Sequence, residues 1–182
     1  MPFLAFLRRL SSRLLLLSLL AGNMAMAQSV VFINPGHAGE VYWRSVSSLM
    51  QAAADSLGMQ LEIVYMDRDH TRTNAVVHAL LARPAKQRPD YVVMTNDYSI
   101  AVALLPQLDQ AGIKTFLAFS SIYDPEHQRQ LGEPRTRLRH WLGSLEPMAE
   151  EIGYGTAQEL IEQGRRNGLV APDGKLHLIA IA

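Results

Sequence analysis

Polar side chains that could bind a small hydroxylated molecule cluster directly after two short apolar runs of the sequence. Asp67-Arg68-Asp69-His70 follows one run and Asn96-Asp97 follows another. Carboxylates, guanidinium groups and amides supply the donors and acceptors that hydroxyl groups need. The same residues also suit helix caps and surface ion pairs, and Asp69 could cap the helix that follows. Several such groups at successive strand ends favour a cleft for a polar ligand.

An aromatic pair offers a second kind of contact. The loop Asn34-Pro35-Gly36-His37-Ala38-Gly39-Glu40 leads to Tyr42-Trp43. Consecutive helical residues point about 100° apart, so at most one ring faces the core and the other can project toward the strand ends. A flat ring there could stack on the apolar face of a sugar. The alternative is that Trp43 belongs to the core and Tyr42 is simply exposed.

Other chemistries have little support in the sequence. The loop before Tyr42 lacks the third glycine of a dinucleotide fingerprint and the Gly-Lys-Ser/Thr of a P-loop, so we expect no cofactor. The six histidines have no His-x-x-x-His or His-Glu-x-x-His spacing, which argues against a metal site. No cysteine is present, and Ser120-Ser121 lacks the context of a nucleophile elbow, so we expect no enzyme. A formal net charge of zero gives no electrostatic sign of a nucleic-acid partner.

The elements that would position these groups alternate regularly. Strands are expected at residues 30–33, 61–66, 91–94 and 115–119, with amphipathic helices between them, and Pro106 should kink or divide the third helix. The first strand, at 30–33, is continuously apolar, which is typical of a strand buried on both faces. The sequence therefore predicts an α/β fold with a parallel sheet and helices on both faces, whose ligands bind at the carboxyl ends of the strands.

The rhythm changes after residue 120. Residues 121–140 are polar and rich in turn signals, and we expect them to connect two lobes. A short strand at 141–143, a helix from Pro147 to about Asn167 and a strand at 176–181 should then follow. The inner face of that helix would be formed by Ile152, Ala157, Leu160, Ile161 and Gly164. We expect an N-terminal lobe at 28–120 and the truncated start of a second lobe at 141–182.

The first segment is typical of a secretory signal. Arg8, Arg9 and Arg13 precede an apolar run at 14–21, and Ala25-Met26-Ala27 is a small-x-small cleavage site. The run is shorter than the ~20 apolar residues that a membrane span needs. We therefore expect residues 1–27 to be a signal peptide cleaved after Ala27, and the mature chain to be periplasmic.

The mature chain resembles the type I periplasmic solute-binding proteins for sugars, the ribose- and galactose-binding kind. The likeness lies in Val31-Phe32-Ile33-Asn34-Pro35 with Tyr42-Trp43, then Ala111-Gly112-Ile113-Lys114-Thr115-Phe116, Trp141-Leu142-Gly143-Ser144 and Gly174-Lys175-Leu176-His177-Leu178-Ile179. One departure is Leu145-Glu146, where the family has an Asp-Asn pair. Family members also continue for roughly another half-length.

The resemblance implies binding of a small polar solute, a sugar or sugar-like signal, for import through a membrane permease or for a membrane sensor kinase. It assigns the ligand contacts to seven residues: Asn34, Tyr42, Trp43, Asp67, Arg68, Asn96 and Phe119. With most of a second lobe absent, we expect this chain alone to bind weakly or not at all. The alternatives are an exported α/β enzyme, a hydrolase or reductase, and a truncated remnant that binds nothing.

Overall fold

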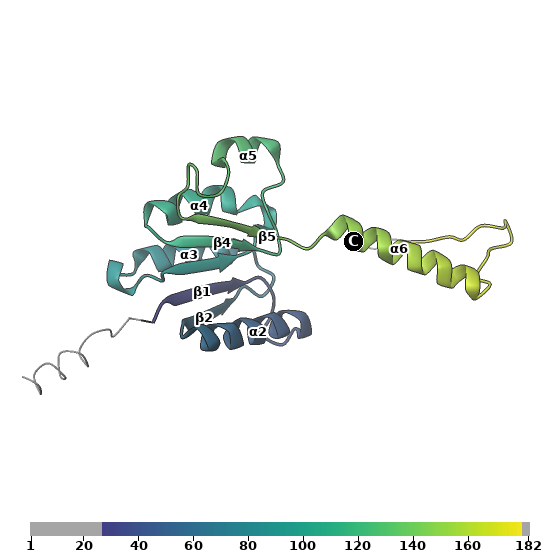
Figure 1. The fold of residues 1–182 in the computed structure, drawn as a ribbon, viewed down its shortest axis with the longest axis horizontal. Coiled ribbons are helices and arrows are strands. Elements are labelled where there is room, and N and C mark those ends of the chain that lie inside the picture. The colour runs from purple at the N-terminus through teal and green to yellow at the C-terminus, as the bar shows by residue number, and fades with distance from the viewer. Residues whose placement is uncertain (1–26, 180–182) are drawn as a thin grey trace, which may run out of the picture.

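The computed structural model describes residues 27–179, which form a parallel sheet flanked by helices and a further helix that leaves the sheet (Figure 1). The strands are β1 (Ser29–Asn34), β2 (Gln60–Tyr65), β3 (Tyr91–Met94), β4 (Lys114–Ala118) and β5 (Trp141–Leu145). The helices are α2 (Val41–Leu57), α3 (Thr71–Ala82), α4 (Ala101–Gln110), α5 (Pro125–Leu131) and α6 (Ala149–Arg166). Two 3₁₀ turns, η1 (Ala85–Gln87) and η2 (Asp97–Ser99), flank β3.

The sheet has the strand order β2-β1-β3-β4-β5, and every neighbouring pair is parallel. This confirms the predicted α/β fold class. Right-handed crossovers place α2 on one face of the sheet and α3 and α4 together on the other. The connections leave β1 and β3 in opposite directions, so a switch point lies between the carboxyl ends of these two strands.

The core lies mainly between the sheet and the pair α3 and α4. Val31 and Ile33 of β1 belong to it, together with Leu80 of α3 and Leu104 and Leu108 of α4, all at most 2% exposed. Burial of each such side chain stabilises the fold by about 1.5–3 kcal/mol.

Pro106 was expected to kink or divide the third helix; the division is wrong, whereas a kink stays a prediction. The helix α4 continues through Pro106 from Ala101 to Gln110. Leu104, Leu105 and Leu108, all within 1% of full burial, anchor it on both sides of the proline. Their burial offsets the hydrogen bond that the proline removes.

The boundary expected at residue 120 also needs correction, because the first lobe extends to Leu145. The strand β5 pairs in parallel with β4 and so completes the same sheet, where we had expected 141–143 to open a second lobe. Trp141 is 4% exposed and lies in the core of this lobe. The segment 121–140 is therefore a crossover within the lobe, and it contains α5, whose first turn is capped by the Asp124 carboxylate.

Beyond β5 the chain leaves the lobe as an arm, which we define as α6 and the segment at residues 167–179 (Figure 1). Leu176 packs against Gly164, the one buried residue of α6. The expected inner face is not covered by the lobe, since Ile152 is 59% and Leu160 51% exposed. Residues 176–179 form no strand, and the rest of the strand expected at 176–181 lies outside the described residues.

The predicted signal segment also lies outside the described residues, except for Ala27 at its end. Among the helices that the structure describes, none has the length and apolar character to cross a membrane.

Candidate ligand site at the carboxyl edge of the sheet

Backbone strain gathers in the loops that follow the strands. Six non-glycine residues of the described chain have a left-handed backbone, and all except Arg135 lie in these loops. They are Asp67 and Arg68 after β2, Tyr98 and Ser99 after β3, and Phe119 after β4, with φ between 54° and 65°. Such conformations are uncommon for residues with a side chain and cluster at functional sites. The carboxyl edge of the sheet is therefore the first place to look for a ligand site.

The loop after β1 is organised by a fully buried amide. The Asn34 side chain accepts a hydrogen bond from the Gly36 N–H (2.9 Å) and donates to the Ser47 hydroxyl (2.9 Å) and the Trp43 carbonyl (3.2 Å). Asn34 is 0% exposed. Its polar groups thus hold the loop against α2. The fully buried Asn34 side chain positions this loop, and it does not face a ligand as we had predicted.

Three aromatic rings meet beside this loop. Tyr42, Trp43 and Phe119 pack edge to face, with ring centroids 5.0 Å (Tyr42–Trp43), 5.3 Å (Trp43–Phe119) and 6.1 Å (Tyr42–Phe119) apart. Trp43 is 8% exposed and Tyr42 54%, so one ring of the pair faces inward and the other outward, as the spacing predicted. The Trp43 ring lies directly against Gly36, where no side chain would fit. Trp43 is therefore a core residue, whereas ligand contact by Tyr42 or Phe119 stays a prediction.

Ion pairs join the loops after β1 and β2. Arg68 donates to both carboxylate oxygens of Glu40, with its Nε 3.2 Å from Oε2. Asp67 accepts from Arg72 (2.8 Å) and lies 3.2 Å from the His37 ring Nδ1. These contacts brace the two loops against each other, and they leave the remaining N–H groups of Arg68 for another acceptor.

The ion pairs change the titration of the carboxylates. The hydrogen bond from Arg68 lowers the pKa of Glu40 below its ordinary value of 4.5. The hydrogen bond from Arg72 likewise lowers the pKa of Asp67 below 3.8. Asp69 accepts from the N–H and hydroxyl of Thr71, the first residue of α3, and the hydroxyl bond lowers its pKa. The N-cap position itself is His70, which makes no side-chain cap, so the cap expected from Asp69 is not formed. All three groups are thus held as anions at neutral pH.

The loop after β3 is tied to the end of β4. Asn96 donates from its side chain to the Ser121 carbonyl (2.8 Å) and accepts from the Ala101 N–H (3.0 Å), while its own N–H donates to the Ser120 hydroxyl (2.6 Å). Ser121 in turn shares a hydrogen bond with Ser144 at the end of β5 (2.9 Å). Asn96 therefore positions the edge of the sheet, because both ends of its amide already have protein partners.

A hollow of about 400 Å³ opens at the switch point between β1 and β3. Its lining residues come from the loops after β1, β2 and β3 and from the start of α3: Pro35, Met66, Arg68, His70, Thr73, Asp97 and Tyr98. Met66 is buried beneath it, whereas Asp97 and Tyr98 are exposed. The lining combines guanidinium, carboxylate, hydroxyl and imidazole groups with the phenol ring of Tyr98, which suits a polar ligand with apolar ring faces.

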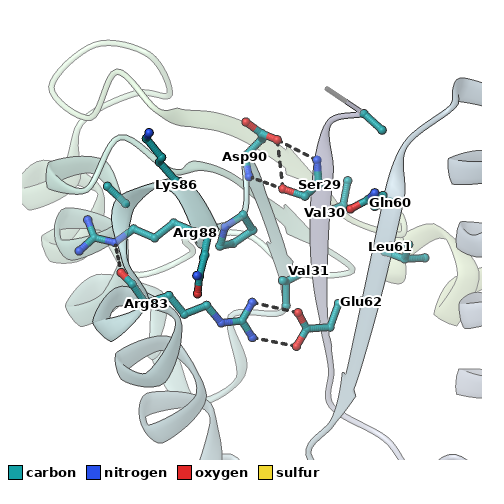
Figure 2. A pocket seen from close by; sticks show the side chains of 14 residues that line it. Ser29, Val30, Val31, Gln60, Leu61, Glu62, Arg83, Lys86, Arg88 and Asp90 are labelled. Carbon is teal, nitrogen blue, oxygen red and sulfur yellow. Dashed lines mark hydrogen bonds and ion pairs between the residues drawn. The ribbon is translucent and has the colours of Figure 1, made fainter. Parts of the chain in front are cut away.

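A larger hollow, of about 560 Å³, lies at the opposite end of the sheet, beside the amino ends of β1 and β2 (Figure 2). Several of its charged groups already have partners in the protein. Arg83 and Glu62 form two hydrogen bonds of 3.0 Å, and the Asp90 carboxylate accepts from the N–H and hydroxyl of Ser29. Because parallel α/β sheets bind ligands at the carboxyl ends of their strands, we place the candidate site in the smaller hollow.

Of the seven predicted contacts, Arg68 alone lines that hollow. Asp67 lies beside it in an ion pair, and Asn34, Trp43 and Asn96 hold the surrounding loops. His70, Asp97 and Tyr98 also line the hollow but are not among the seven residues, although His70 and Asp97 belong to the polar clusters noted in the sequence. Their position directly after the second and third predicted strands is a sequence signal that could have identified them.

No protein-family model and no curated protein matches this chain. Among solved structures, it is similar to a periplasmic sugar-binding protein from Pseudomonas fluorescens, with 34% sequence identity and a TM-score of 0.61. The match covers 73% of this chain and 36% of that one. The lobe has the fold of a periplasmic binding protein lobe. This chain spans about a third of the length of the solved structure.

Proposed function

We propose that the chain binds a small polar solute, a sugar or sugar-like molecule, in the periplasm. The hollow at the switch point carries the proposal, because Arg68 from the loop after β2 meets Asp97 and Tyr98 from the loop after β3 there. The chain is also 34% identical to a periplasmic sugar-binding protein over the part that matches. Guanidinium and carboxylate groups pair with sugar hydroxyls, and aromatic rings cover the apolar faces of sugars.

The finer parts of the proposal follow the resemblance in the sequence. The chain would be a type I, ribose- or galactose-binding protein, and it would serve a permease for import or a membrane sensor kinase. Export requires removal of residues 1–27, so intact-mass analysis of the periplasmic protein should give an N-terminus at Gln28. Protein that retains Met1 in that fraction would contradict export by cleavage.

Binding is tested by NMR titration of the full chain with D-ribose, D-galactose and D-glucose. Water in the open hollow competes for each hydrogen bond, so we expect affinities in the millimolar range. Arg68→Gln should weaken binding by about tenfold, which corresponds to about 1.4 kcal/mol for a hydrogen bond from a charged group.

The matched control is Arg83→Gln, which breaks an ion pair at the opposite edge of the sheet. It should leave the sugar affinity unchanged. Equal losses in the two variants, or saturable binding by neither the variants nor the unmodified chain, would contradict the proposed site.

A further inference from the structure

The arm carries a large share of the apolar side chains that remain exposed. Nearly half of the exposed large apolar residues of the described chain lie on it, although it makes up about a fifth of residues 27–179. They are 49–88% exposed: Ile152, Tyr154 and Leu160 in α6, and Leu169, Val170, Leu178 and Ile179 after it. The arm leaves the lobe, so the lobe does not cover them (Figure 1). Apolar surfaces of this kind mark sites of association.

The two halves of α6 differ in what covers them. Near the end of the helix, Leu176 of the following segment packs on Gly164, which is buried. Near its start the helix is bare, and Tyr154 is 74% exposed. The covering segment keeps a bare apolar side chain of its own, because Ile179 is 88% exposed. Each arm therefore has a bare stretch of helix and a segment that can cover such a stretch in another copy.

The charges of α6 complement a reversed copy of the same helix. Glu150 lies in its first turn and Arg165 in its last, and neither forms an ion pair within the part of the chain that the structure describes. Arg166, by contrast, pairs with Glu159 and Glu162 of its own helix. In an antiparallel pair the first turn of each helix lies beside the last turn of the other, so Glu150 and Arg165 meet at both ends. A parallel pair would bring like charges together.

We propose that a second copy of this chain covers the arm, in an antiparallel dimer whose two-fold axis passes near Ala157, midway between Glu150 and Arg165. The bare start of each α6 lies against the covering segment of the other copy. Each buried apolar side chain removes on the order of 100 Å² from water, so the seven on the arm remove roughly 700 Å² per copy. This is close to the ~800 Å² that each partner buries in a stable interface of standard size.

The two kinds of contact have different roles in this dimer. Exposed ion pairs contribute little affinity, so the apolar surface holds the two copies together. The pairs of Glu150 with Arg165 fix the direction in which the helices meet. The pairing does not depend on the proposed sugar binding, and it can stand or fail separately.

Sedimentation equilibrium of the full chain tests the pairing, and we expect a dimer in equilibrium with the monomer. Leu160→Glu and Tyr154→Glu each place a charge in the contact and should raise the dissociation constant tenfold or more, as ~1.4 kcal/mol does. The matched control is Leu49→Glu, at a 72% exposed position of α2 in the lobe, which should leave the constant unchanged. Urea denaturation of each variant shows that its lobe remains folded.

Two results of this experiment would overturn the proposal. One is a chain that stays monomeric at on the order of 100 µM, with its arm covered by another partner or by none. The other is a dimer that tolerates Leu160→Glu and Tyr154→Glu as well as it tolerates Leu49→Glu, because such a dimer would use another surface.

Exchange of charges tests the direction and the identity of the partner. Glu150→Arg and Arg165→Glu should each weaken the dimer severalfold, because like charges then meet at both ends. Mixed in equal amounts, the two variants should form a mixed dimer as stable as that of the unmodified chain, and native mass spectrometry identifies it by its mass. Arg44→Glu, on the exposed surface of α2, is the control and should have no effect. Variants that weaken the dimer but form no mixed dimer would contradict the antiparallel pairing.

Discussion

Replacement of Asn34 by alanine should destabilise the lobe strongly, although the residue is small and polar. Its amide makes three hydrogen bonds of 2.9–3.2 Å in a fully buried position, to Gly36, Ser47 and Trp43. Buried hydrogen bonds contribute about 1 kcal/mol each, and an orphaned buried N–H costs more. Ser47 still accepts from the Tyr65 hydroxyl, so the largest cost falls on the Gly36 N–H. We expect a loss of about 3 kcal/mol in the free energy of unfolding.

Urea denaturation of the full chain measures this loss, and the slope of the transition shows whether the two-state analysis holds. The control is Asn74→Ala, which removes an exposed amide from α3 and should change stability by less than about 0.5 kcal/mol. A loss below about 1 kcal/mol for Asn34→Ala, at an unchanged slope, would refute the role we assign to this amide.

Two further predictions concern the same loops. Gly36→Ala places a methyl group inside the Trp43 ring and should lower the free energy of unfolding by about 1–3 kcal/mol in the same denaturation assay. The control Gly39→Ala has open space around it and should be nearly neutral. Similar values for both variants would contradict the close packing of Gly36 on Trp43. Arg72→Gln should raise the lowered pKa of Asp67 toward 3.8. The measurement is an NMR titration of the Asp67 carboxyl group. Because the folded-state pKa of Asp67 is lowered, the Asp67–Arg72 ion pair contributes its full stability above pH 3.8, and this contribution is lost as the pH falls through the lowered pKa. An unchanged pKa of Asp67 in Arg72→Gln would contradict the pairing.

The sheet was predictable from the sequence because its strands are local signals. Each of β1 to β4 contains a short, mostly apolar run that is followed by polar or turn residues, which is enough to place parallel strands and their carboxyl ends. The role of β5 was not predictable in the same way. Trp141-Leu142-Gly143 is a weak strand pattern, and only its long-range pairing with β4 shows that it belongs to the first lobe.

The site was predicted at the carboxyl ends of the strands, where the candidate hollow also lies, but of the seven predicted residues Arg68 alone lines that hollow. Residue type indicates which side chains can bind a sugar, but not which of them already have partners in the protein. Asn34 and Asn96 are suitable for a ligand in chemical terms, yet their amides bond to neighbouring loops. Tyr98 faces the hollow only because of its left-handed backbone, a conformation that no sequence pattern here predicts.

The position of a bound sugar tests the central claim most directly. Backbone amide shifts of the isotope-labelled full chain, followed during titration with the tightest-binding of the three monosaccharides, would map that position. We predict that the largest changes occur at Arg68, His70 and Tyr98, around the hollow at the carboxyl edge. Changes concentrated at Ser29 and Arg88, in the hollow at the opposite edge, or no saturable change at all, would contradict the account.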